Sequence, residues 1–145
     1  MGEWSDGIEG LVVLSDGRRI RGRGLRRPVP TDTERPEFGL YLTGTEHSEI
    51  RWESRWIRWP DYRLPSSTDA ALQALWDAHE RALSQRVEIA CGGGRGRTGT
   101  AIALLARMAG VPAAEAVLWT RRHYRPHAVE TPWQRRWVTT AKLAR

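Results

Sequence analysis

The sequence predicts an α/β fold in which a small central sheet is flanked by helices. Short runs rich in β-branched and aromatic residues dominate the first sixty or so positions, whereas apolar residues recur at helical spacing over much of the rest. One short apolar run, residues 86–90, separates two helical patterns and leads into a glycine-rich loop. Strands first and helices afterwards are typical of a mixed domain around one core.

Length and composition favour one domain, residues 1–145, without a membrane span. A chain of 145 residues buries roughly two-thirds of the surface that its unfolded form exposes. Hydrophobic residues at 40% and charged residues at 28% exclude disordered and collagen-like chains. No apolar run approaches the roughly 20 residues that cross a bilayer, and the first ten residues do not resemble a signal peptide. We therefore expect a cytoplasmic protein.

The N-terminal part reads as strands separated by turns. Residues 10–14 and 18–22 flank a turn at residues 15–17. The proline-containing stretch 23–37 is predicted to be irregular, and residues 38–43 form the next strand. In the run 49–59, apolar residues fall on one face of a strand up to Trp56 and on the opposite face from Ile57 onward. We interpret this change of phase as a β-bulge.

Four helices are predicted after this strand region. Capping side chains at residues 66–69 begin a helix that ends near Ser84. Residues 98–109 are apolar almost all round, which predicts a buried helix stopped at Gly110. Pro112 suits the first position of a helix to about residue 122, and Thr131 followed by Pro132 begins the last one.

Charge and cysteine content narrow the chemistry. The net charge of +6 favours anionic partners, although only one of the 23 basic residues is a lysine. The single cysteine, Cys91, excludes an intramolecular disulfide and any zinc site that needs several cysteines. We expect neither a metal nor a cofactor. Taken alone, a cysteine at the end of an apolar strand is more often a packing residue than a nucleophile.

The residues after Cys91 change that interpretation. Glycines predominate in the loop from Cys91 to Thr98, and a helix is predicted to begin where the loop closes. Glycines let successive backbone N–H groups turn inward around an anion, and the helix N-terminus adds about half a positive charge. Arg97 is suited to two parallel hydrogen bonds with phosphate oxygens. In such a field Cys91 is expected to ionise readily and act as a nucleophile.

Two motifs resemble one family. The spacing from Cys91 to Arg97 and Thr98 is similar to the phosphate-binding loop of the cysteine-dependent protein tyrosine phosphatase superfamily, and Trp59-Pro60-Asp61 resembles its acid loop upstream. The resemblance implies that Cys91 attacks phosphorus and forms a cysteinyl-phosphate, that Asp61 protonates the leaving group, and that Thr98 hydrogen-bonds the departing sulfur. It also implies the residues that hold the phosphate: Gly92, Gly93, Gly94, Arg95, Gly96 and Arg97.

Two positions complicate the resemblance. The stretch 125–134 is similar to the family's late helix start, which implies that Gln134 helps to place the attacking water. Thr131 and Gln134 also have the spacing of a capping box, a purely structural role, and both interpretations stay open. The family usually has a histidine before the cysteine, where this chain has Ala90, so the support of the thiolate differs from the family pattern.

Several substrates and one other class of function remain open. The leading expectation is a phosphomonoester hydrolase acting on phosphotyrosine or on phosphoserine and phosphothreonine in proteins. Arg95 at the mouth of the loop keeps phosphoinositides and other polyphosphates as alternatives. The charge, the Arg-Gly steps and the aromatic residues suggest a non-catalytic nucleic-acid-binding module as the rival. Nucleic acid is the less favoured partner because these residues hold a fixed spacing rather than a repeated tract. The sequence leaves the oligomeric state open.

Overall fold

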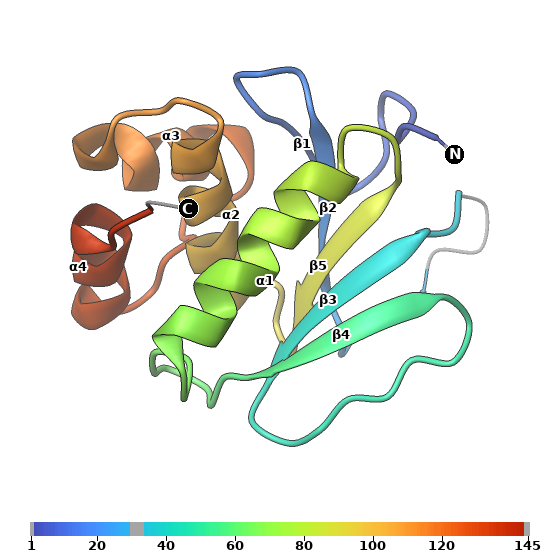
Figure 1. The fold of residues 1–145 in the computed structure, drawn as a ribbon, viewed down its shortest axis with the longest axis horizontal. Coiled ribbons are helices and arrows are strands. Elements are labelled where there is room, and N and C mark those ends of the chain that lie inside the picture. Colours follow the sequence, from blue (N-terminus) through green and yellow to red (C-terminus); the bar gives the residue numbers. More distant parts are fainter. Residues whose placement is uncertain (1, 30–33, 144–145) are drawn as a thin grey trace.

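The computed structural model describes residues 2–29 and 34–143, and within them the chain forms five strands, four α-helices and one 3₁₀ turn (Figure 1). The strands are β1 (Leu11–Val13), β2 (Arg19–Gly24), β3 (Phe38–Thr43), β4 (Glu53–Arg58) and β5 (Val87–Cys91). The helices are α1 (Thr68–Arg81), α2 (Gly96–Met108), α3 (Ala116–His123) and α4 (Pro132–Thr140), with the 3₁₀ turn η1 (Ala113–Glu115) before α3. The predicted α/β class is confirmed.

The sheet has the strand order β1-β2-β5-β3-β4, which places β5 at its centre. Only the edge strand β1 is antiparallel to its neighbour, and the other four strands are parallel. The carboxyl ends of parallel strands meet at one edge of a sheet. The segments that follow β2, β4 and β5 therefore gather at one edge, although they are far apart in the sequence.

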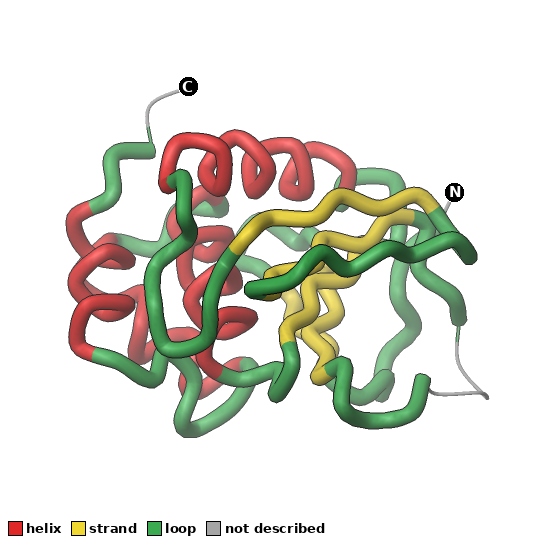
Figure 2. Tube along the Cα trace, turned by 90° about the horizontal axis from the view of Figure 1, so that it is seen from below, coloured by secondary structure: helices red, strands yellow, loops and turns green. Residues whose placement is uncertain are grey.

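The main core lies between the sheet and the helices, which Figure 2 shows together to one side of the strands. Ile20, Leu40 and Ile89 contribute the sheet side of this core, and α2 is buried along nearly its whole length. The predicted buried helix is thus confirmed, beginning at Gly96 rather than Thr98. No helix in the described part of the chain is both long and apolar enough to span a membrane.

The other face of the sheet carries a buried charge network. Glu88 of β5 is fully buried, and its carboxylate accepts hydrogen bonds from the guanidinium groups of Arg21 and Arg23 on β2 and from the Tyr41 hydroxyl on β3. Trp4 covers Arg21, with its ring 4.4 Å from the guanidinium carbon. Burial alone would raise the pKa of Glu88, but the hydrogen bonds and charges of Arg23 and Arg21 hold that pKa below its usual value.

Three boundaries differ from the sequence-based expectations. The register of β3 with β4 runs without a break from Phe38 opposite Glu53 to Thr43 opposite Arg58, so the predicted bulge is wrong. Residues 49–52 form a loop in which Glu49 pairs with Arg51 and Ile50 is 94% exposed. Trp56 and Ile57 are neighbours within β4 and therefore lie on opposite faces of the sheet without a bulge, Ile57 in the core and Trp56 donating to the Thr43 carbonyl oxygen on the other face.

The other two differences concern residues 23–37 and the helix predicted from Pro112. Arg23 and Gly24 continue β2, because both pair with β5; residues 30–33 of the expected irregular stretch lie outside the described residues. Pro112 precedes the short η1 turn, and the α-helix itself begins at Ala116. The helix predicted to end near Ser84 is confirmed but ends at Arg81, and the last helix is also confirmed, with Ser67 and Thr131 as the capping residues of the two helices.

Substituting Glu88→Gln is expected to destabilise the fold by about 3–5 kcal/mol, because it leaves Arg21 and Arg23 buried without a countercharge. The lowered pKa means that the carboxylate stabilises the fold above pH 4.5 and that this contribution is lost as the pH falls through the folded-state pKa. The free-energy difference between the wild type and E88Q, measured by urea unfolding, should therefore shrink in acid.

The exposed Glu46→Gln serves as the matched control and should unfold like the wild type. Tyr41→Phe removes the hydrogen bond to Glu88 and also the one that the Trp52 indole donates to the Tyr41 hydroxyl, and should cost about 1–3 kcal/mol, which keeps the test informative should E88Q fail to fold. Equal stability of E88Q and the wild type at neutral pH would contradict a stabilising role for the network.

Candidate active site

Cys91 ends the central strand and begins the glycine loop. Its side chain is only 1% exposed, and its sulfur accepts a hydrogen bond from the Gly94 N–H at 3.2 Å. The loop curls back over the sulfur because Gly94 has a φ of +72°, a left-handed conformation that residues with a Cβ rarely adopt. The thiol therefore lies at the floor of a turn of backbone amides.

The segment after β2 supports this turn. The N–H groups of Leu25 and Arg26 donate to the carbonyl oxygens of Cys91 and Gly92, at 2.8 and 3.1 Å. Gly24 and Gly94 approach so closely that a Cβ on Gly94 would lie 2.5 Å from the Gly24 nitrogen, and a Cβ on Gly24 would lie 2.9 Å from the carbonyl carbon of Gly93. The shape of the loop thus depends on glycines in two distant segments.

The N-terminus of α2 opens toward the same loop without a capping side chain. Arg95 is the N-cap residue, but its side chain makes no capping hydrogen bond, and the first turn holds no acidic residue. By contrast, Ser67 and Thr131 cap α1 and α4 through their side chains. The first N–H groups of a helix lack acceptors within the helix, so an anion is the natural partner here.

Arg97 connects the loop to the segment that follows β4. It is 6% exposed, and its Nη1 donates to the Trp59 carbonyl oxygen at 3.1 Å. Its Nη2 lies 3.5 Å from a carboxylate oxygen of Asp61, while its Nε has no hydrogen-bond partner among the described residues. Nε and Nη2 form one edge of the guanidinium, the edge that a phosphate can bind with two oxygens.

Asp61 is placed beside the loop, as the sequence predicts. Its carboxylate is 42% exposed, lies between Arg97 and Arg26, and accepts the N–H of Tyr62 at 3.0 Å. The helix α4 holds the same segment from its other side. The Trp133 indole donates to the Tyr62 carbonyl oxygen, and the Gln134 amide donates to that of Arg63 at 3.2 Å.

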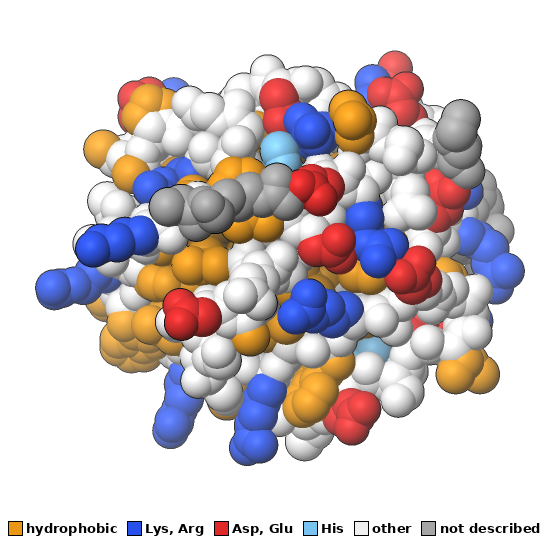
Figure 3. Space-filling view, in the orientation of Figure 1, with side chains coloured by type: hydrophobic (Ala, Val, Ile, Leu, Met, Phe, Trp, Pro, Cys, Tyr) orange, Lys and Arg blue, Asp and Glu red, His pale blue; other side chains and the backbone are white. Residues whose placement is uncertain are grey.

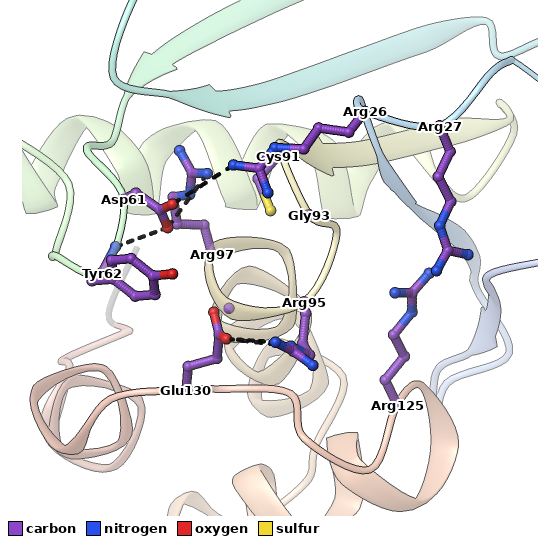
Figure 4. A pocket seen from close by; sticks show the side chains of 11 residues that line it. Arg26, Arg27, Asp61, Tyr62, Cys91, Gly93, Arg95, Arg97, Arg125 and Glu130 are labelled. Atoms are coloured by element: carbon purple, nitrogen blue, oxygen red, sulfur yellow. Dashed lines mark hydrogen bonds and ion pairs between the residues drawn. The ribbon is translucent and has the colours of Figure 1, made fainter.

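These residues surround a cavity of about 180 Å³, shown in Figure 4. Five arginines line it: Arg26, Arg27, Arg95, Arg97 and Arg125. Two carboxylates, Asp61 and Glu130, face them, and Cys91 and Gly93 contribute its floor. Most ligand pockets are larger, about 300–1,000 Å³, and mainly apolar. This cavity therefore suits a small, strongly anionic group.

Thr98 and Gln134 are not among the residues that line the cavity. The buried Thr98 hydroxyl has no hydrogen-bond partner among the described residues, so no bond to Cys91 is formed. Gln134 is 1% exposed and forms the predicted capping box, because its amide oxygen accepts the Thr131 N–H and the Thr131 hydroxyl accepts the Gln134 N–H. The structural interpretation of Gln134 is thus confirmed, and its role toward water stays a prediction.

Sequence reasoning missed five lining residues, Arg26, Arg27, Tyr62, Arg125 and Glu130. Glu130 pairs with Arg95 at 3.2 Å and crowds Gly96, where a Cβ would collide with its carboxylate. Its place within the stretch 125–134, which resembles the family's late helix start, was a usable signal. Nothing in the sequence pattern pointed to Arg26 and Arg27, because they reach the loop only through the parallel pairing of β2 with β5.

Comparison with known proteins agrees with this geometry. The family model described as protein-tyrosine phosphatase matches residues 30–144. Among solved structures, the crystal structure of Tk-PTP in the active form has a TM-score of 0.62 and 24% identity, covering 90% of this chain and 97% of that one. A putative protein tyrosine phosphatase from Leishmania major has a TM-score of 0.56 and 20% identity, covering 74% and 73%. No curated protein sequence matches.

The two structural likenesses show a fold of the protein tyrosine phosphatase type. The family match extends over most of the sequence, so the chain belongs to the protein-tyrosine phosphatase family. Membership supports phosphatase activity and leaves the substrate open.

Substituting Gly94→Ala is expected to disrupt the loop, because a Cβ there meets the β2 backbone and the residue must keep a positive φ. Gly17→Ala is the matched control: Gly17 also has a positive φ, +91°, but nothing lies within 4 Å of its Cβ position. The control should lose about 1–2 kcal/mol from strain alone. G94A should lose more and should also lose phosphate affinity, measured by thermal unfolding with and without phosphate.

Proposed function

We propose that this protein hydrolyses phosphomonoesters through a cysteinyl-phosphate intermediate formed on Cys91. The observation that carries the proposal is the position of the Cys91 sulfur, at the floor of an arginine-lined cavity beside the uncapped N-terminus of α2. Anion, nucleophile and proton donor would meet there, because Asp61 lines the same cavity.

In the first step the Cys91 thiolate attacks phosphorus, and the bond from phosphorus to the ester oxygen breaks. Asp61 transfers its proton to that oxygen, so the alcohol or phenol leaves neutral. Arg97 donates from Nε and Nη2 to the equatorial phosphate oxygens, while its Nη1 keeps its bond to Trp59. The loop N–H groups supply the remaining donors.

In the second step water attacks phosphorus and the sulfur–phosphorus bond breaks. Asp61, now a carboxylate, accepts a proton from the water. Inorganic phosphate is released, and the Cys91 thiolate is restored. The Thr98 hydroxyl has no hydrogen-bond partner among the residues that the structure describes, which supports a role as donor to the departing sulfur. The side-chain amide of Gln134 is already hydrogen-bonded in the capping box and to the Arg63 carbonyl oxygen. Any contribution of Gln134 to placing the water therefore comes through the position of the segment that carries Asp61.

Phosphorylated tyrosine, serine or threonine side chains of proteins are the substrates that the family resemblance favours. The cavity itself recognises the phosphate, and only Tyr62 adds an aromatic ring to its rim. The arginines at the mouth favour a second candidate, a polyphosphorylated small molecule. On the face shown in Figure 3, acidic and basic side chains of the coloured residues are intermixed, which gives no support there to a nucleic-acid-binding surface.

Cys91→Ser is expected to reduce hydrolysis of p-nitrophenyl phosphate to the uncatalysed background, because a serine hydroxyl is not ionised at neutral pH and is a poor nucleophile without a base. The assay is run with EDTA present. Phosphate binding by the variant, followed by calorimetry, should persist, since the loop amides and Arg97 remain. Turnover by C91S close to that of the wild type would rule out the cysteinyl-phosphate mechanism.

Asp61→Asn is expected to lower kcat about a hundred- to ten-thousandfold for alkyl phosphates, whose leaving oxygen needs a proton. For p-nitrophenyl phosphate, with a good leaving group, the loss should be much smaller. The exposed Asp69→Asn, outside the cavity, is the control and should leave both rates unchanged. Equal losses with the two leaving groups would show that Asp61 is not the acid.

A further inference from the structure

Two cavities meet at one pair of arginines. Arg27 and Arg125 line the catalytic cavity and also a second, smaller cavity beside the end of β2. In Figure 4 their guanidinium groups face each other on the side of the cavity away from Asp61. The other residues of the second cavity are Glu9, Arg21, Gly22, Arg23, Gly24 and Pro28.

The charges of this pair are poorly neutralised within the protein. No carboxylate pairs with Arg125 among the described residues, and its guanidinium carbon lies 5.4 Å from the centre of the Tyr124 ring. Arg27 pairs with Glu9 at 3.2 Å, but the two side chains are 61% and 71% exposed, and such surface pairs contribute little. Facing guanidinium groups repel each other, so an anion between them would be bound favourably.

Tyr124 fixes this pair relative to the phosphate loop. Its hydroxyl donates to the Gly94 carbonyl oxygen, and its ring occupies the space where a side chain on Gly22 would lie. Burial raises the pKa of Tyr124, so the hydroxyl stays protonated and remains a donor at physiological pH. The position of Arg125 is thus tied, through its neighbour, to the loop that binds the first phosphate.

On the basis of the proposed function, we propose that Arg27 and Arg125 bind a second phosphate of the substrate, and that the preferred substrate is a small molecule carrying two neighbouring phosphates. One phosphate would lie over Cys91 and the other between the two arginines. The shared rim of the two cavities favours a short separation between the phosphates.

The lining of the cavities favours a small molecule over a peptide. Among the described residues, Tyr62 and Pro28 are the only bulky apolar ones in either lining. Peptide recognition commonly uses a sheet edge or apolar side-chain pockets in addition to a phosphate contact. Besides three carboxylates, Glu9, Asp61 and Glu130, these cavities offer mainly arginines and glycines, which bind phosphate oxygens rather than apolar side chains.

The test compares kcat/KM for an inositol bisphosphate with adjacent phosphates and for the corresponding inositol monophosphate. The wild type should favour the bisphosphate by about tenfold or more, since a second charge-assisted contact is made. Arg125→Ala and Arg27→Ala should bring this ratio close to one. Glu9→Gln should raise the ratio, because it frees Arg27 from its competing carboxylate. Arg122 is an exposed arginine that lines neither cavity, so Arg122→Ala is the control and should leave the wild-type ratio unchanged.

A ratio near one in the wild type, or a ratio that R125A leaves unchanged, would overturn the inference. So would a stronger preference for a doubly phosphorylated peptide than for the bisphosphate. Calorimetry with C91S separates this inference from the proposed function, because binding does not require turnover. C91S should bind the bisphosphate more tightly than the monophosphate, and the double variant C91S/R125A should not. This result would support the subsite even if p-nitrophenyl phosphate were not hydrolysed. Hydrolysis of p-nitrophenyl phosphate without any preference for the bisphosphate would overturn the subsite alone.

Discussion

The close approach of β2 to the loop after β5 is the constraint on which the site depends. Gly24 and Gly94 lie against each other without side chains, and Gly94 also has the positive φ that turns its N–H toward Cys91. A Cβ at either position would separate the two segments. The hydrogen bonds from Leu25 and Arg26 to the loop carbonyls depend on the close approach of the two segments. The same approach brings Arg26 and Arg27 to the cavity.

The sheet face behind the loop has its own requirement. Glu88 lies three residues before Cys91 on the same strand, and its carboxylate is surrounded by Arg21, Arg23 and Tyr41. The strand register places Ala90 directly between Arg23 and Tyr41. A small side chain fits there beside the network, which gives a packing reason for the departure from the family's histidine. Because a buried ion pair tolerates the loss of neither partner, the network also holds β2 and β5 in one register.

The sequence predicts best the features that local rules determine. The capping residues Ser67 and Thr131, the apolar helix after the loop, and the spacing from Cys91 to Arg97 all follow from neighbours in the chain. Sequence-based prediction fails where the pairing of distant segments determines the structure. The sequence predicts the stretch 49–59 as one strand with a bulge, but only residues 53–58 pair with β3. Arg27 belongs to no motif, and it meets Arg125 only after β2, β5 and α3 have packed, so the sequence does not predict the pair.

The acid segment shows how one helix serves both stability and position. Residues 59–63 leave the sheet and are held on one side by Arg97, which donates to the Trp59 carbonyl. On the other side the first turn of α4 supplies two donors, Trp133 to Tyr62 and Gln134 to Arg63. The capping bonds with Thr131 hold both the backbone and the side-chain amide of Gln134 in the position from which it donates to Arg63. The capping box therefore influences the carboxylate indirectly: it sets where α4 begins, and the beginning of α4 sets where Asp61 lies relative to Cys91.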